Sequence, residues 1–260
     1  MTNIISIVQQ KLIKLGLWLT AGLILATTTI CSSPALAVSP INPNLEEQVL
    51  QIIRTHPEVI IEAAQLYQQQ QLQKRQEAQK KSLQVFKTNP EALIGDSPTR
   101  GTTEHKILLV EFSDFQCPYC AKVSQTVKQF MTKHQDEVTL VYKHLPLASI
   151  HSQAIPAAQA AWAAGKQGKF WEYHDSLFAQ RENLSEELYL DIAQSLKLNL
   201  EKFNLDRNGE AVAKDIQTDI SLAQTLNLNG TPSFIMSDEV FSGAIELSDL
   251  ESILERVRNS

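Results

Sequence analysis

The sequence predicts an α/β fold in which a strand–helix–strand unit, a helical block and a strand–strand–helix unit follow one another along the chain. The first observation is the apolar run 107–112, which is typical of a central strand covered on both faces. The second is a C-x-x-C motif at 117–120, placed between that run and a helical pattern. The third is a pair of short strand patterns followed by a capping box near the C-terminus. Together they predict two β-containing halves separated by a helical insertion.

Each element follows from its local pattern. A strand, a helix and a second strand in this order make a βαβ unit whose strands are parallel. The next region, about 150–226, is helical in pattern, and Ser185 with two following glutamates is typical of a helix start. The expected elements are turns at 95–98 and 101–102, a strand at 107–112, a helix at 121–134, a strand at 138–142, helices between 152 and 226, an antiparallel pair at 233–236 and 239–243, and a helix opened by Ser248.

The first 37 residues have the features of a secretory signal peptide. Lys11 and Lys14 precede an apolar stretch, 15–30, that is short for a membrane span of about 20 residues. Ser32-Ser33-Pro34 interrupts the stretch, and Ala35-Leu36-Ala37 matches the small-x-small cleavage pattern. We expect cleavage after residue 37 and export to the periplasm or an equivalent extracytoplasmic space. The alternative is an uncleaved signal that anchors the protein in the membrane.

Cleavage at that point changes both the cysteine count and the charge. It removes Cys31 and leaves two of the three cysteines, both in the C-x-x-C motif. It also removes two lysines, so the formal net charge falls from −6 to −8. An acidic chain of this kind argues against nucleic acid or an anionic membrane surface as a partner. Disulfides persist outside the cytoplasm, where a redox-active cysteine pair has a use.

Residues 38–90 are predicted to be a helical extension ahead of the domain 91–260. A short Pro-containing linker leads into a helix at about 45–54. Pro57 and Glu58 then start a second helix that is expected to reach about residue 87.

The second of these helices changes character along its length. Its first half is apolar, whereas the run 68–81 is almost entirely polar and has no face that fits a core. Two interpretations stay open. One is an oligomerisation stalk, in which residues 44–87 associate with copies of the same chain. The other is a surface helix or a poorly ordered linker.

The C-x-x-C motif carries the predicted chemistry. Cys117 stands at a helix start, where free N–H groups and the helix dipole favour a thiolate, so we expect it to be the exposed nucleophile. Cys120 is expected to be the buried resolving thiol, which releases mixed disulfides by attacking Cys117. Pro118 fits the first helical turn, Tyr119 is expected to be exposed, and both are candidates for substrate binding. A purely structural disulfide is disfavoured because its loop is tiny, and half a zinc site is disfavoured because no second ligand pair follows.

Two further positions complete the predicted site. Thr231 and Pro232 stand directly before a predicted strand, and we expect a cis peptide that turns the Thr231 backbone toward the motif and a bound substrate chain. Glu111 lies in the apolar strand six residues before Cys117. Burial would raise the pKa of this carboxyl group and suit it to proton exchange with Cys120. The alternative is a residue at the strand end that reaches solvent.

The six histidines show no spacing typical of metal ligands. His144 and His151 flank the short segment Leu145-Pro146-Leu147, and both histidines are expected to approach the motif. His105, His134 and His174 are expected at the surface or at helix ends.

The chain resembles the DsbA-like thiol oxidoreductases of bacterial envelopes. The matching segments are 110–120 with Cys-Pro-Tyr-Cys, Lys143-His144-Leu145-Pro146-Leu147, the Ala-rich helix leading into Gly168-Lys169-Phe170-Trp171, and Gly230-Thr231-Pro232-Ser233-Phe234. The resemblance implies a thioredoxin-like fold with an inserted helical domain. It also implies a nucleophile at Cys117, a resolving thiol at Cys120, a cis proline at Pro232 and a buried acid at Glu111.

The N-terminal segment resembles a subgroup related to the copper-tolerance protein ScsC. The matching pattern is Ile53-Arg54-Thr55-His56-Pro57-Glu58-Val59-Ile60, followed by a Gln/Lys-rich helix. In that subgroup the segment implies oligomerisation and isomerase activity. Tyr119 departs from the strongest oxidases, which carry histidine at this place, so both oxidase and isomerase activity stay open.

The resulting hypothesis is an exported protein thiol–disulfide oxidoreductase that forms or rearranges disulfides through a redox-active Cys117–Cys120 pair. No cofactor is expected. The expected partners are unfolded or newly exported cysteine-containing proteins and a membrane redox partner, DsbB-like or DsbD-like, that resets the pair. The alternative is a thiol-based copper-binding protein of the envelope that uses the same two cysteines.

Overall fold

The computed structural model describes residues 43–104 and 106–259. The predicted signal peptide, residues 1–37, lies outside the described residues, and so does Cys31. Among the helices that are described, none has both the length and the apolar character needed to cross a membrane.

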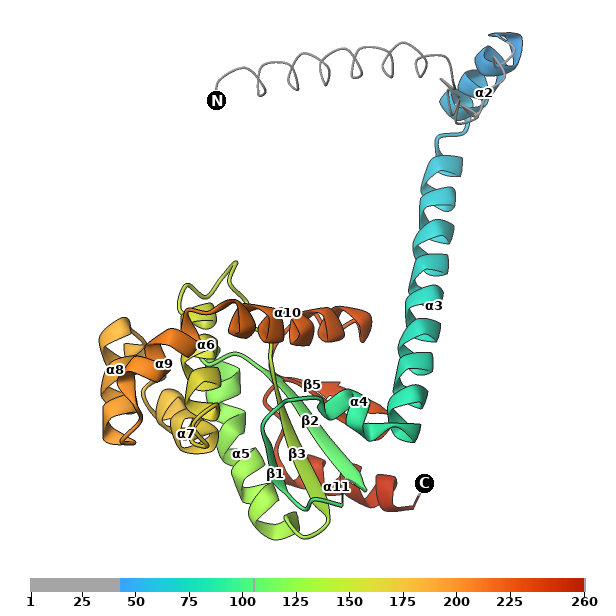
Figure 1. Cartoon of the computed structure of the whole chain (residues 1–260). Helices are drawn as coiled ribbons and strands as arrows, with labels where there is room; N and C mark the ends of the chain where they lie inside the picture. Colours follow the sequence, from blue (N-terminus) through green and yellow to red (C-terminus); the bar gives the residue numbers. More distant parts are fainter. Residues whose placement is uncertain (1–42, 105, 260) are drawn as a thin grey trace, which may run out of the picture. The chain divides into compact units, whose positions relative to one another are not determined.

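Within the described residues, a five-stranded mixed sheet forms the centre of the fold (Figure 1). Its order is β1–β3–β2–β4–β5; β2 and β3 pair in parallel, and the other neighbours are antiparallel. The register places Glu111 of β2 between Tyr142 of β3 and Phe234 of β4. The strands are β1 (Thr99–Gly101), β2 (Ile107–Ser113), β3 (Val138–His144), β4 (Ser233–Met236) and β5 (Glu239–Ser242).

Apart from α4, which was not predicted, the helices occur where the sequence predicts helical segments, and the predicted α/β fold class is confirmed. A βαβ unit, a helical block and a ββα unit follow one another in the predicted order. The helices are α2 (Pro43–Thr55), α3 (Glu58–Thr88), α4 (Pro90–Ile94), α5 (Pro118–His134), α6 (Ala154–Gly165), α7 (Phe170–Ala179), the 3₁₀ turn η1 (Arg181–Asn183), α8 (Glu186–Ser195), α9 (Leu200–Arg207), α10 (Glu210–Thr225) and α11 (Leu247–Arg258).

The two faces of the sheet bury different side chains, because successive residues of a strand point to opposite sides. Leu109, Leu140 and Phe234 pack against α5 and α11. Val110 and Ile235 pack on the other face, against α10, α4 and the end of α3. Glu111 shares the face of Leu109, so its carboxyl group points toward the α5 side.

The helical insertion, α6 to α9, has a core of its own that extends to the cysteine motif. The alanines along α6 are buried, and their small side chains allow α7, α8 and α9 to pack closely around that helix. Ser185 caps α8 as predicted, because its hydroxyl accepts a hydrogen bond from the Leu188 N–H at 3.2 Å. Phe115, Cys117 and Cys120 belong to this same apolar cluster. The insertion therefore supplies part of the environment of the two sulfurs.

The chain before the domain divides within α3, because residues up to Ala63 and residues from Ala64 onward form separate compact units. In the second unit, Leu83 near the end of α3 is buried against Leu93 and Ile94 of α4. Gln79 also donates a hydrogen bond from Nε2 to the Leu226 carbonyl oxygen at 2.6 Å. The end of α3 is thus part of the packed domain, and the predicted boundary near residue 90 stays a prediction.

Two local predictions need correction. Residues 101–102 were expected to be a turn, but Gly101 is the last residue of the edge strand β1, which pairs with β3. Gly101 has φ +107, and a Cβ atom there would lie 2.2 Å from the Val138 carbonyl oxygen, so the close approach of the two strands requires glycine. Ser248 was expected to open the last helix, but α11 begins at Leu247 and its N-cap is Glu246.

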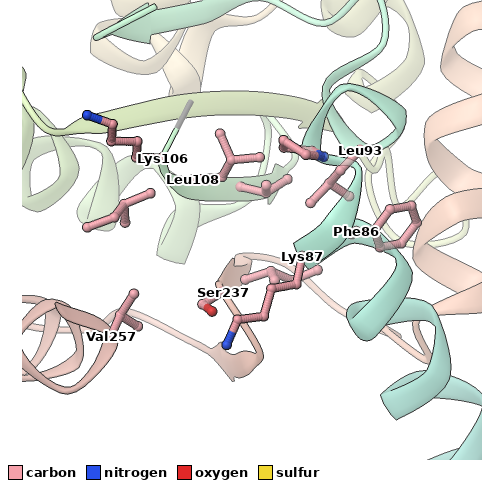
Figure 2. A pocket seen from close by; sticks show the side chains of 11 residues that line it. Phe86, Lys87, Leu93, Lys106, Leu108, Ser237 and Val257 are labelled. Carbon is pink, nitrogen blue, oxygen red and sulfur yellow. The ribbon is translucent and has the colours of Figure 1, made fainter. Parts of the chain in front are cut away.

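A cavity of about 310 Å³ lies where β2 begins, and the cysteine motif follows the other end of the same strand. Figure 2 shows side chains from α3, α4, β2, α11 and the turn between β4 and β5 around it. Leu93, Leu108 and Val257 make its wall apolar, and Lys87 and Lys106 add two ammonium groups. The cavity is therefore separate from the predicted catalytic site.

Candidate active site

The cysteine motif lies at the junction of β2 and α5. After β2 a short loop leads to Cys117, which has an extended backbone (φ −68, ψ 124) and precedes the first turn of α5. Pro118 occupies the first position of the helix, where its missing N–H leaves no hydrogen bond unmade. Cys120 lies in the same first turn, and Tyr119 between the cysteines is 62% exposed, as predicted.

The burial of the two cysteines differs from the prediction in one respect. Cys120 is fully buried, as expected for a resolving thiol. Cys117 was expected to be exposed, but only 3% of its surface is accessible. Long-range packing explains the difference: the Thr231 carbonyl oxygen lies 3.4 Å from the Cys117 sulfur, and the helical insertion packs against the same residue.

Local donors stabilise a negative charge on Cys117 and lower its pKa from the ordinary 9.0 to about 5. The largest contribution is the Cys120 thiol, which donates a hydrogen bond to the Cys117 thiolate; burial acts in the opposite direction. The Thr231 side chain and the backbone N–H groups of Tyr119 and Cys120 add smaller contributions. Cys117 is therefore a thiolate at neutral pH, which is both the reactive nucleophile and a good leaving group.

Cys120 behaves in the opposite way. Burial raises its pKa far above the ordinary value of a thiol, and the hydrogen bond and negative charge of Cys117 raise it further. Cys120 thus holds its proton while the pair is reduced. To attack a mixed disulfide on Cys117 it needs a nearby group that accepts this proton.

Thr231 and Pro232 lie beside the motif, as the sequence predicts. The Thr231–Pro232 peptide bond is cis, and the Thr231 carbonyl oxygen lies 3.4 Å from the Cys117 sulfur. A groove of about 480 Å³ runs along this segment, lined by Gln79 and by residues 227–233 and 240–243. An extended peptide in the groove would lie next to the backbone of Thr231.

Glu111 is buried and does not reach solvent, which excludes the alternative of an exposed strand end. It exposes 1% of its surface, and Oε1 has no hydrogen-bond partner among the described residues. Burial raises the pKa of the carboxyl group to about 7, and the Ser113 hydroxyl opposes this in part. The same hydroxyl lowers the pKa of Cys120, so Ser113 lies beside both groups. Glu111 therefore titrates near neutral pH, close to the resolving thiol.

The loop before Cys117 is held by Asp114, which was not predicted from the sequence, and by His151, which was expected near the motif. Asp114 is buried; Oδ1 accepts from the Gln116 N–H at 2.8 Å, and Oδ2 accepts from the Leu147 N–H at 2.9 Å and contacts His151 Nδ1 at 2.8 Å. The Asp114 carbonyl oxygen accepts from the Cys117 N–H at 3.1 Å. The Ser-Asp-Phe-Gln sequence between an apolar strand and the motif was the available signal, because aspartate commonly closes such turns.

The prediction for His174 is wrong. It was placed at the surface or a helix end, but it lies within α7 and is 6% exposed. It packs among aromatic rings, with ring centroids 5.2 Å from Tyr142 and 4.8 Å from Phe178. His144 lies in the same group, 5.2 Å from Tyr142. The spacing of Phe170, Tyr173, His174, Leu177 and Phe178 is helical and signals a buried face.

No group of three or more His, Cys, Asp and Glu side chains suited to a metal ion occurs within residues 43–104 and 106–259. The copper-binding alternative rests on Cys117 and Cys120 alone.

A helix-start cysteine of low pKa, a buried partner three positions later and a mixed sheet with a helical insertion define a thiol–disulfide oxidoreductase. The model of the family described as Thioredoxin matches residues 94–256. The chain therefore belongs to the thioredoxin family, and its helical insertion gives it the DsbA-like architecture predicted from the sequence.

Solved structures agree with this assignment. A thioredoxin-like oxidoreductase from Silicibacter pomeroyi is 32% identical, covers 66% of this chain and 99% of its own, and has a TM-score of 0.59. The catalytic domain of ScsC from Proteus mirabilis is 24% identical and covers 68% of this chain and 99% of its own, with a TM-score of 0.60. At 24% identity, the similarity to the ScsC domain shows a shared fold alone.

Curated relatives contain the same domain within longer proteins. The Na(+)/H(+) antiporter NhaA 1 of Salinispora arenicola is 36% identical over 156 residues, which are 59% of this chain and 23% of the relative. The chain thus spans about a quarter of the length of the curated relatives it matches. The antiporter's activity belongs to that protein.

Proposed function

We propose that the protein is exported and that it forms or rearranges disulfides in other envelope proteins through the Cys117–Cys120 pair. The observation that carries this proposal is the opposite tuning of the two thiols, in which the pKa of Cys117 is lowered and the pKa of Cys120 is raised. A pair tuned in this way has one sulfur that reacts with substrate and one that resolves the product. The predicted signal peptide, residues 1–37, supports export.

In the oxidising direction, a substrate thiolate attacks the Cys117 sulfur of the Cys117–Cys120 disulfide. A substrate–Cys117 disulfide forms, and Cys120 leaves and takes up a proton. A second substrate thiolate then attacks the substrate sulfur, the substrate disulfide forms, and Cys117 leaves as a thiolate. Two electrons pass from substrate to protein. A low pKa of Cys117 stabilises the reduced protein and so supports donation of the disulfide.

The groove beside Thr231 is the proposed substrate site. The Thr231 backbone in this groove offers an edge along which an extended, unfolded chain can lie. Tyr119 provides an exposed ring at the C-x-x-C motif. Pro118 and Pro232 flank the sulfurs. These features support cysteine-containing unfolded proteins as substrates, and a DsbB-like or DsbD-like membrane protein is the proposed partner that resets the pair.

Residues 44–87 are the proposed site of self-association. Both α2 and the first half of α3 expose large apolar side chains to solvent, which is typical of a surface that binds a partner. Those with more than about a third of their surface accessible are Leu45, Val49, Leu50, Ile52, Val59, Ile60, Ile61, Leu66, Tyr67 and Leu72. If this surface joins copies of the chain, deleting residues 38–63 should lower the number of chains per particle, measured as the mass of the particle in solution divided by the mass of one chain.

The test of the proposed function is the reduction potential of the Cys117–Cys120 pair in a glutathione buffer. A value near about −120 mV, as in strong oxidases, would support a disulfide donor. A value near about −270 mV, as in thioredoxin, would contradict the oxidase and leave a reductase or isomerase.

A further inference from the structure

Glu111 needs a route to solvent, because it is the group placed to take the proton of Cys120 and yet it is buried. Each cycle of the proposed function removes a proton from Cys120 when the pair is oxidised and restores it when the pair is reduced. A carboxyl group with 1% exposure cannot exchange that proton with solvent directly. The surroundings of Glu111 therefore have to contain a second proton carrier.

A small cavity joins Glu111 to the surface of the molecule. Its volume is about 10 Å³, close to the space that one water molecule fills. Glu111, His174 and Asp175 line it together with Lys128 and Arg100. The Asp175 side chain is 36% exposed, and that of Lys128 is 55% exposed. The cavity thus runs from a buried carboxyl group to groups in contact with solvent.

Besides Glu111, His174 is the residue lining this cavity that has a buried side-chain atom without a partner in the described chain. Its Nδ1 lies 2.9 Å from Asp175 Oδ1, and Asp175 Oδ2 accepts from Lys128 Nζ at 3.0 Å. Paired in this way, Nδ1 carries the proton of the neutral ring and Nε2 is left as an acceptor. His174 Nε2 is buried and has no hydrogen-bond partner within the described part of the chain, and the same holds for Glu111 Oε1.

The other charged groups around the cavity do not offer an acceptor. Arg100 and Lys128 are cations with donors only. On the far side of His174, the rings of Tyr142 and His144 belong to the same aromatic group, and burial raises the pKa of Tyr142 and lowers that of His144. Burial also lowers the pKa of His174 itself, so the ring is neutral, and its Nε2 atom is unpartnered within the described chain.

We propose that His174 and Asp175 form a proton-transfer route that connects Glu111 with solvent through one water molecule in this cavity. The proposal rests on the proposed function and adds a second pair of residues to it. His174 and Asp175 do not touch the reacting sulfurs, and they act through Glu111.

In the half of the cycle in which the Cys117–Cys120 pair itself is oxidised, each proton given up by one group is taken up by the next. Cys120 gives its proton to the Glu111 carboxylate, and the resulting thiolate attacks the sulfur of Cys117 in a mixed disulfide. Glu111 passes a proton to the cavity water, which gives one of its own to His174 Nε2. The imidazolium formed beside Asp175 releases the Nδ1 proton to solvent. When the pair is reduced, each transfer runs in reverse and the ring returns to its first tautomer.

The experiment follows oxidation of the reduced full chain by oxidised glutathione in stopped flow. The first phase is attack by Cys117 and the second is attack by Cys120 on the mixed disulfide. We expect His174→Phe, which keeps the aromatic packing, to slow the second phase about tenfold or more, the scale of a lost acid–base group. The first phase and the reduction potential should not change. Asp175→Asn should slow the second phase less.

A matched control is His134→Phe, because His134 also pairs with a carboxylate, Glu137, at 2.9 Å and packs on an aromatic ring but does not line the cavity. It should leave both phases unchanged. An unchanged second phase in His174→Phe, with a slow one in Glu111→Gln, would overturn the route and leave the proposed function intact. Failure of the wild-type chain to form the Cys117–Cys120 disulfide would overturn both. A changed reduction potential in His174→Phe would mean a structural role and would also overturn the route.

Discussion

Two buried polar clusters lie on opposite faces of the sheet, and they differ in whether their hydrogen bonds are made. The paired cluster consists of Lys143 and Asp219: Lys143 Nζ lies 3.1 Å from Asp219 Oδ1 and donates to the Ile94 carbonyl oxygen, and Asp219 Oδ2 accepts from the His144 N–H. The unpaired cluster consists of Glu111, Tyr142 and His174, each with a side-chain atom that has no partner in the described chain.

The difference separates a structural site from a chemical one. A buried ion pair whose remaining hydrogen bonds are made gains little from a change of protonation, so it holds segments together. Buried groups without partners cost stability, and such groups persist where protons have to move. The unpaired cluster lies behind Cys120, and the paired cluster lies on the face away from α5. Substitutions in the two clusters should therefore affect different properties.

The largest effect is expected at the nucleophilic sulfur of the motif, Cys117. Cys117→Ser should abolish disulfide exchange with glutathione, because the serine hydroxyl is not a nucleophile at neutral pH. The unfolding midpoint should stay nearly unchanged, because the hydroxyl has almost the same volume as the thiol. Cys120→Ser is the matched variant, and it should accumulate a mixed disulfide on Cys117 that mass spectrometry detects. Exchange that survives in Cys117→Ser would place the chemistry elsewhere.

The paired cluster should respond through stability alone. Asp219→Ala leaves the Lys143 ammonium buried without its partner and should lower the free energy of unfolding by about 3–5 kcal/mol. Urea unfolding measures this, and the rate of oxidation by glutathione should not change. As a control, Glu172→Ala removes an exposed partner of Lys169 and should cost less than about 1 kcal/mol. Equal effects of the two substitutions would contradict a structural role for the buried pair.

Glu111 of the unpaired cluster should make the free energy of unfolding depend on pH. The pKa of Glu111 is raised from 4.5 to about 7 in the folded protein, so between these values the folded protein binds more protons than the unfolded chain. The stabilising contribution is complete below about pH 4.5 and is lost as the pH rises through 7. The shift corresponds to about 3 kcal/mol.

Glu111→Gln should remove this dependence, because the amide does not ionise. Urea unfolding at about pH 5 and about pH 8 measures it, since these values fall near the two ends of the titration. Glu201→Gln, at an exposed position of α9, is the control and should leave the dependence as it is. A wild-type protein whose stability rises between these two pH values would contradict a buried Glu111 of raised pKa.

The smallest effect is expected from Thr231→Val, which keeps the side-chain shape and removes a hydroxyl group that lowers the pKa of Cys117. The pKa of Cys117 should rise above about 5, but by less than the loss of the Cys120 thiol would raise it, because Cys120 is the larger contributor. The pH dependence of alkylation of Cys117 measures both values. Thr225→Val, at an exposed site, should not move the profile. An unchanged profile in Thr231→Val would show that this side chain does not lower the pKa of Cys117.

The parts of the fold that the sequence predicts well are those with a local signal. The apolar run of β2, the motif and the start of α5 are adjacent in the chain, so strand, sulfur and helix follow from consecutive residues. The burial of Cys117 depends instead on Thr231 and on the helical insertion, which lie far along the chain, and local patterns do not contain that contact.

Two other differences have local causes. β1 has three residues and ends in a glycine, so strand periodicity cannot develop over its length. His174 was considered alone as a titratable residue, whereas its spacing from Phe170 and Phe178 places it on the buried face of α7. Glu111 was identified because a carboxyl group within an apolar strand is itself an anomaly. Its contact with the cavity and with His174 depends on three-dimensional packing.

The Lys143–Asp219 pair also bears on how this architecture varies. Lys143 and His144 stand where the chain leaves the sheet for the helical insertion, and Asp219 lies on α10, where the insertion returns. The pair therefore closes the insertion as a loop at its base. Once a loop is closed, doubling its length costs only about 0.6 kcal/mol in closure entropy. Helical blocks of other sizes should thus be exchangeable at this point by grafting, provided that the lysine and the aspartate at the two junctions are retained.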